Sequence, residues 1–338
     1  MKLALSSSSL KALCYGLLNI ISASGIVFAN KAVFQNYGFH FTFALTEVHT
    51  AFTLLSMVLL SKLGFFEAKS IPQSRLTQLA AAYVGYIVLC NLSLKVNTVG
   101  FYQVMKIAVA PTVIALDVLL FGRLPQPKII ASVLVVCAGI AVATVTDSQM
   151  LSNVTGMAIG GAATVVTALY QSWAGSKQKE LKASSMQLLQ AYTPQATLML
   201  GVLVPMCEQM GWSSTYRSKD TLLGYPYSWG ACVAILVSAA LGLLVSLSTF
   251  LVIGATSSLT YNVVGHLKTV IILTGGCLFF GDSMPLKKLI GVSVAMVGIV
   301  WYTHLKLVQS EASSSSSTGP EGHPQQPLLP SKHNGHQA

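Results

Sequence analysis

The sequence predicts an all-α membrane protein with ten transmembrane helices, arranged as two inverted five-helix repeats. Three observations lead to this fold class: an apolar composition, ten apolar segments of spanning length, and a weak internal repeat. Of the 338 residues, 53% are hydrophobic and 9% are charged, and the mean hydropathy is +0.65. Soluble domains carry about 25% charged residues. The composition therefore excludes an ordinary soluble domain.

A helix needs about 20 mostly apolar residues to cross the hydrocarbon core of a bilayer. Ten segments meet this requirement: residues 10–32, 41–62, 76–97, 100–121, 128–146, 154–174, 186–208, 228–253, 257–280 and 288–308. They predict one ten-helix domain at 1–309, with repeats at roughly 10–150 and 151–309. Residues 310–338 are rich in Ser, Pro, Gly and His and cannot bury an apolar core, so we expect a disordered cytosolic tail there.

The distribution of lysine and arginine predicts the orientation, since cytosolic loops carry more of both residues. With the N-terminus in the cytosol, twelve of the 20 fall on the cytosolic side and six on the opposite side. We therefore expect a multi-pass protein with both termini cytosolic. The net charge of +10 arises mostly at the span ends, so the expected partner is a lipid bilayer and not a nucleic acid. The sequence leaves a homo-oligomer open.

The internal repeat becomes visible when the chain is shifted by 159 residues against itself. This shift aligns tyrosines, lysines and glycines of the two halves, including the pairs Tyr102 and Tyr261, Gln103 and Asn262, Lys128 and Lys287, and Gly139 and Gly298. Five is an odd number, so two five-helix units in tandem insert with opposite orientations. Inverted repeats of this kind place a binding site near the membrane midplane, between the two halves.

Two lysines lie inside predicted spans, where ionisable side chains are costly and usually functional. Lys106 is part of GFYQVMKIAVAP, and Lys268 is part of VVGHLKTVI. In the repeat, Lys268 falls on position 109, which shares a helix face with Lys106. Tyr102 and Tyr261 lie along the same faces. The two faces together predict a cavity with two cations and two aromatic hydroxyls, which suits an anion with two or more charges.

Four other ionisable residues fall within spans, namely Glu47, His49, Asp117 and His266. Glu47 and Asp117 could neutralise the two lysines, which is the purely structural interpretation. Glu47, together with Lys31 near the end of the first span, is alternatively a gating or charge-pairing residue. We interpret His266 as a packing or interhelical hydrogen-bonding residue.

The residues do not favour a membrane enzyme such as a lipid-linked glycosyltransferase. That chemistry needs carboxylates that hold a metal at a membrane face, whereas the ten acidic residues form no DxD or DxxD pair. The six cysteines have no CxxC spacing, so no metal site is indicated, and no cofactor is expected. A purely structural membrane protein does not explain two lysines on equivalent faces of a repeat.

GFYQVMKIAVAP, followed about 150 residues later by TYNVVGHLKTV, resembles the drug/metabolite transporter superfamily and, within it, the nucleotide-sugar and triose-phosphate translocator family. Lys268-Thr269, Asn30-Lys31 and the GFF at Gly64–Phe66 are similar to plant-type UDP-sugar transporters of the Lys-Thr group. The resemblance covers about residues 10 to 308. It implies ten helices, inverted repeats, and exchange of a nucleotide sugar for a nucleoside monophosphate across a Golgi or endoplasmic reticulum membrane.

From this resemblance we expect an antiporter that exchanges a UDP-sugar, of the galactose, rhamnose, xylose or arabinose type, for UMP across the Golgi membrane. We expect phosphate contacts from the two lysines, nucleotide contacts from the two tyrosines, and further polar contacts from three neighbours: Lys106, Lys268, Tyr102, Tyr261, Thr269, Asn262 and Gln103. Two lysines suit a carrier that must not bind its substrate too tightly.

The alternative is exchange of a triose phosphate or another organic phosphate for inorganic phosphate. Plastid carriers of that type have Lys-Arg where this chain has Lys268-Thr269. Losing the arginine removes a bidentate phosphate ligand, so the resemblance favours the UDP-sugar.

Overall fold

The computed structural model describes residues 7–96, 99–144, 154–213, 218–280 and 286–316. These residues form ten long α-helices: α1 Ser7–Lys31, α2 Thr42–Lys62, α3 Thr77–Val96, α4 Val99–Phe121, α5 Pro127–Thr144, α6 Val154–Glu180, α7 Ser185–Cys207, α8 Trp229–Ala255, α9 Ser258–Phe280 and α10 Leu286–Ser316. Each predicted segment coincides with one helix. The largest differences are at α6, which continues past residue 174 to Glu180, and at α10, which continues past residue 308 to Ser316.

Five segments of the described chain are long and apolar enough to cross a membrane: Leu10–Asn36, Thr42–Lys62, Val154–Glu180, Trp229–Ala255 and Leu289–Lys306. Thr77–Ser93 and Pro127–Val142 are shorter apolar helices. Large apolar side chains are exposed on the outer faces of these helices, for example Ile21, Leu55 and Leu198, each about two-thirds exposed or more. Apolar outer faces suit a lipid environment. That all ten helices span the bilayer stays a prediction.

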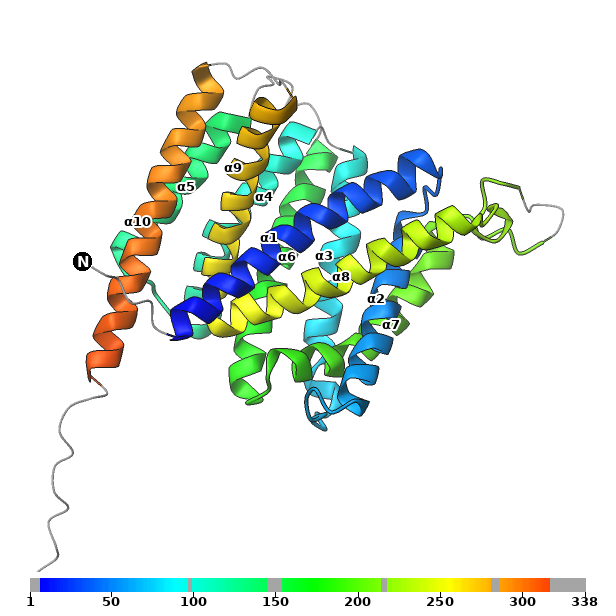
Figure 1. The fold of residues 1–338 in the computed structure, drawn as a ribbon, viewed down its shortest axis with the longest axis horizontal. Coiled ribbons are helices and arrows are strands. Elements are labelled where there is room, and N and C mark those ends of the chain that lie inside the picture. Colours follow the sequence, from blue (N-terminus) through cyan, green and yellow to red (C-terminus); the bar gives the residue numbers. More distant parts are fainter. Residues whose placement is uncertain (1–6, 97–98, 145–153, 214–217, 281–285, 317–338) are drawn as a thin grey trace, which may run out of the picture.

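The helices pack in a pattern that joins the two halves of the chain. Figure 1 shows α5 and α10 side by side at one edge of the bundle, and α1 crossing beside α8. The other extensive contacts are α3 with α6, α2 with α7, and α4 with α6. Within the described residues, four buried apolar clusters lie between the helices. One is between α4, α5, α9 and α10, one is around α3, α6, α7 and α8, one joins the start of α2 to the end of α7 and the start of α8, and a small one is between α4 and α6.

The carboxylate of Glu208, directly after α7, holds the start of α2 in place. Its Oε1 accepts a hydrogen bond from the Phe43 amide at 2.6 Å, and its Oε2 accepts one from the Ala44 amide at 3.1 Å. The first amides of a helix have no partner within the helix, so a carboxylate there both satisfies them and complements the helix dipole. Glu208 thereby fixes the position of α2 relative to α7.

Candidate functional site

The structure brings the two predicted lysines together. α4 and α9 contact each other through a buried cluster that includes Ile107 of α4 and Val263 and Val270 of α9. Lys106 is exposed although it lies within α4, and Lys268 of α9 is partly buried. The two ammonium groups interact electrostatically. Two like charges at this proximity within a helical bundle repel each other, and a bound polyanion would remove that repulsion.

Tyr261 of α9 lies near Lys106. Lys106 interacts electrostatically with the Tyr261 side chain, and the Tyr261 hydroxyl accepts a hydrogen bond from Thr249 of α8 at 3.4 Å. The ring of Tyr261 also packs against the cluster around α3, α6, α7 and α8. Lys106 is thus within electrostatic range of both Lys268 and Tyr261, and contact of these residues with a substrate stays a prediction.

The side chains of Asn262 and Thr269 on α9 donate hydrogen bonds to other groups of the protein. Asn262 is buried, and its amide nitrogen donates hydrogen bonds to Gln171 Oε1 of α6 and to the Ser258 carbonyl oxygen at 2.9 Å. Both amide hydrogens are thus used to tie α9 to α6 and to itself. The Thr269 hydroxyl donates to the carbonyl oxygen of Gly265 at 3.2 Å. Substrate contact by these two residues stays a prediction.

The side chains of Tyr102, Gln103 and Lys31 lie outside the described residues. Their roles as substrate contacts and as a gating or charge-pairing residue stay predictions.

Glu47 faces α7 rather than either lysine. A Cβ added at Gly201 of α7 would lie 3.7 Å from Glu47 Oε1, and Glu47 Oε2 is buried without a hydrogen-bond partner. In the described part of the chain the ion pair within 4 Å joins Lys177 and Glu180, so Glu47 pairs with neither Lys106 nor Lys268 in this conformation. Pairing in another conformation stays a prediction.

The two histidines within the helices differ in their partners. His49 Nε2 lies 2.9 Å from the Ser238 hydroxyl oxygen of α8, so His49 links α2 to α8. His266 of α9 is buried, and its Nε2 has no hydrogen-bond partner. The structure thus shows a packed histidine at position 266, without an interhelical hydrogen bond from that nitrogen.

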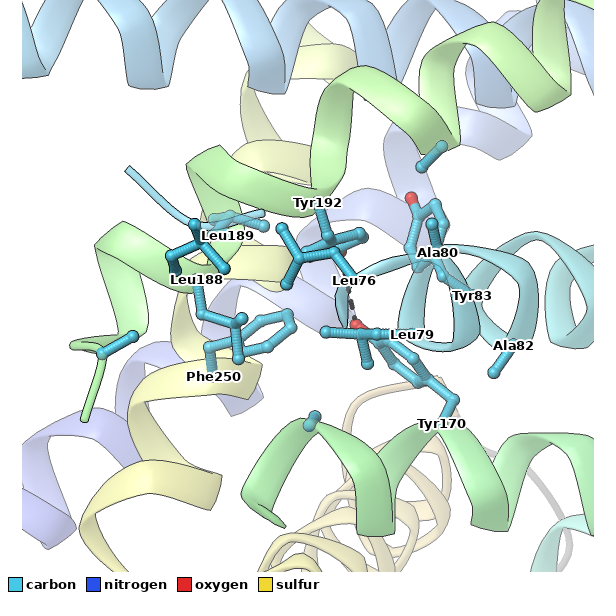
Figure 2. Packing of buried hydrophobic residues seen from close by; sticks show 14 of the residues in the cluster. Leu76, Leu79, Ala80, Ala82, Tyr83, Tyr170, Leu188, Leu189, Tyr192 and Phe250 are labelled. Carbon is cyan, nitrogen blue, oxygen red and sulfur yellow. Dashed lines mark hydrogen bonds between the residues drawn. The ribbon is translucent and has the colours of Figure 1, made fainter. Parts of the chain in front are cut away.

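A cluster of tyrosines was not predicted from the sequence. Figure 2 shows Tyr83 of α3, Tyr170 of α6, Tyr192 of α7 and Phe250 of α8 pointing toward one another. The ring centroid of Tyr83 lies 5.6 Å from the ring centroid of Tyr170 and 5.5 Å from that of Tyr192. The hydroxyl oxygens of Tyr170 and Tyr192 are 3.5 Å apart. Aromatic residues in an apolar helix are usually core residues, so the sequence offered no signal for a cluster beside the lysines.

A bundle of long helices with apolar outer faces is typical of a multi-pass membrane protein. The chain belongs to the Triose-phosphate Transporter family, whose model matches residues 11–303. The family is one of transporters and not of enzymes, as the lack of paired acids indicated.

Curated relatives match most of the chain. It is 32% identical over 301 residues to UDP-xylose transporter 2 of Arabidopsis thaliana, covering 89% of this chain and 83% of the relative. It is 33% identical over 302 residues to UDP-rhamnose/UDP-galactose transporter 1 of the same plant, covering 89% and 85%. A solved crystal structure is similar to this chain with a TM-score of 0.65 at 13% identity, covering 87% of this chain and 96% of that one, which supports the helical fold.

Proposed function

We propose that this protein is an antiporter that carries a UDP-sugar, of the galactose, rhamnose, xylose or arabinose type, in exchange for UMP. The observation that carries the proposal is the proximity of Lys106, Lys268 and Tyr261 within a chain whose relatives are named as UDP-sugar transporters. A UDP-sugar has two phosphates and one base, and UMP shares the base and one phosphate. Two cations beside an aromatic ring suit both molecules.

In this mechanism the two lysines bind the phosphates as compact point charges. Lys106, which is exposed, meets the anion first, and the partly buried Lys268 completes the charge balance. Tyr261 and Tyr102 contact the nucleotide, with Gln103, Asn262 and Thr269 as further polar contacts. Glu47 and Lys31 act as gating or charge-pairing residues when the substrate leaves.

Alternating access is proposed to follow from two inverted five-helix repeats, α1–α5 and α6–α10. The helix contacts support this arrangement. If each helix of one repeat is replaced by its counterpart in the other (α1 by α6, α2 by α7 and so on), most pairs of contacting helices become pairs that are also in contact. The α1–α8 contact becomes α6–α3, α1–α9 becomes α6–α4, and α2–α8 becomes α7–α3, and all are present. The contacts α2–α7, α4–α9 and α5–α10 map onto themselves. A pseudo-two-fold axis in the membrane plane has this consequence.

The proposed location is the Golgi membrane, with the endoplasmic reticulum as the alternative and both termini in the cytosol. The excess of lysine and arginine on the side of the N-terminus supports this orientation. The family resemblance supports an internal membrane in which nucleotide sugars are delivered to the lumen.

The second candidate is exchange of a triose phosphate or another sugar phosphate for inorganic phosphate. The matching family model is described as the Triose-phosphate Transporter family, which favours this possibility. Thr269 beside Lys268 lacks the planar cation that would clamp a single phosphate in two places, and the relatives above are named for UDP-sugars.

Ligand-dependent thermal stability of the purified protein distinguishes the two candidates. A ligand that binds only the folded state stabilises it by about 2.7 kcal/mol at 100 times its dissociation constant. We expect UMP and UDP-sugars to raise the melting temperature, and GMP, CMP, inorganic phosphate and glyceraldehyde 3-phosphate to leave it unchanged. Stabilisation by inorganic phosphate and triose phosphate, without any effect of UMP, would contradict the proposal.

A further inference from the structure

Tyr86 differs from the other tyrosines of the aromatic cluster. Its ring stacks on Tyr170 with centroids 5.0 Å apart and planes at 24°, whereas Tyr83 meets it edge to face at 5.6 Å. Tyr83, Tyr170 and Tyr192 are buried, but Tyr86 is only partly buried. One face of the Tyr86 ring is therefore backed by a fixed aromatic partner, while part of the side chain remains accessible.

The hydroxyl group of Tyr86 also differs from those of Tyr83 and Tyr170, which have hydrogen-bond partners. The Tyr83 hydroxyl lies 3.2 Å from Thr50 Oγ1, and the Tyr170 hydroxyl lies 3.5 Å from that of Tyr192. Within the described part of the chain, the Tyr86 hydroxyl forms no hydrogen bond. A residue needed only for packing usually has its polar tip satisfied when it lies in a helical core.

Tyr86 also adjoins the lysine site. It interacts electrostatically with Tyr261 of α9 and with Cys90, one turn further along α3. Lys106 of α4 interacts electrostatically with the same two residues. Cys90 Sγ in turn lies 3.8 Å from Thr167 Oγ1 on α6. Residues from α3, α4, α6 and α9 thus interact with one another in the neighbourhood of Tyr86.

We propose that Tyr86, backed by Tyr170, is the surface on which the uracil ring of the substrate stacks. This inference rests on the proposed function, and it divides the site into a phosphate end at the lysines and a base end at Tyr86. A planar base stacks well on an aromatic ring that neighbouring rings already hold in place, because little side-chain entropy remains to be lost. Since UDP-sugar and UMP share the uracil, the stacking surface serves both directions of exchange.

The test compares three variants of the full-length protein in proteoliposomes. We expect Tyr86→Leu to raise the KM for UDP-galactose and for UMP by a similar factor, about 5- to 150-fold. Tyr86→Phe keeps the ring, so both KM values should stay within about twofold of wild type. Tyr192→Leu is the matched control, because Tyr192 is buried in the same cluster without stacking on Tyr86. It should lower thermal stability and leave both KM values within about twofold.

Two results would overturn the inference. A higher KM for UDP-galactose with an unchanged KM for UMP would place Tyr86 at the sugar. Unchanged KM values with reduced thermal stability would make Tyr86 a packing residue.

Wild-type protein is measured first with UMP, GMP, CMP and inorganic phosphate. A response to GMP or CMP in place of UMP would refute the UDP-sugar assignment alone, and Tyr86→Leu measured with that nucleotide would still decide base stacking. A response to inorganic phosphate alone would overturn both.

Discussion

Lys268→Ala and Lys106→Ala should each reduce kcat/KM for UDP-sugar exchange by about 10- to 150-fold, since a hydrogen bond to a charged group contributes roughly 1.5–3 kcal/mol. The reason is that each variant removes one of the two cations that the structure brings together between α4 and α9. Initial rates of UDP-galactose uptake into UMP-loaded proteoliposomes, normalised to the amount of reconstituted protein, measure the effect.

Two controls accompany these variants. Lys268→Arg keeps the positive charge and should retain more activity than Lys268→Ala. Lys177→Ala removes a lysine at the end of α6 whose ammonium pairs with Glu180 at 2.8 Å, and it should transport like wild type. Normal transport by both Lys106→Ala and Lys268→Ala would show that the lysines do not bind the phosphates.

Gly139→Leu should prevent the protein from folding, and Gly139→Ala should cost about 1–3 kcal/mol of stability or more. Gly139 of α5 lies against the backbone of α10, where an added Cβ would be 2.8 Å from both the Ala295 Cα and the Gly291 carbonyl oxygen. A Cβ added at Gly298 of α10 would likewise be 2.8 Å from the Val136 amide nitrogen of α5. Backbone atoms cannot rotate away, so any side chain at position 139 separates the two helices. Yield of monodisperse protein and its melting temperature in detergent measure the effect.

Gly161→Ala is the matched control for that prediction. Gly161 lies in α6, and a Cβ added there meets nothing within 4 Å. We expect Gly161→Ala to be as stable as wild type or slightly more stable, because alanine favours a helix over glycine by about 1 kcal/mol. Equal stability of Gly139→Ala and Gly161→Ala would show that the close approach of α5 and α10 is not required for folding.

The positions of the helices could be predicted from the sequence because lipid-facing helices need long apolar runs. The predicted 257–280 and the observed Ser258–Phe280 nearly coincide. The prediction ended α6 at residue 174, whereas the helix continues through SKQKE to Glu180. Hydropathy detects where a helix contacts lipid, and these last polar residues continue the helix without that contact.

The site could be predicted in part. A lysine within an apolar helix is costly, so Lys106 and Lys268 were identifiable from the sequence alone. The expected contact of Asn262 with substrate stays a prediction. Its hydrogen bond to Gln171 could not be predicted, because a single sequence does not reveal which polar residues of two helices meet. Tyr86 was missed for another reason, since a tyrosine in AAAYVGYIVLC has the pattern of an ordinary core residue.

Uptake of labelled UDP-galactose, UDP-rhamnose, UDP-xylose and UDP-arabinose into proteoliposomes tests the central proposal most directly. The vesicles contain UMP, GMP, CMP, inorganic phosphate or buffer alone, and the wild-type protein is compared with Lys268→Ala. We predict uptake of at least one UDP-sugar only into vesicles that contain UMP, and strongly reduced uptake by the variant. Uptake of sugar phosphate into vesicles that contain inorganic phosphate, with no movement of any UDP-sugar, would contradict it.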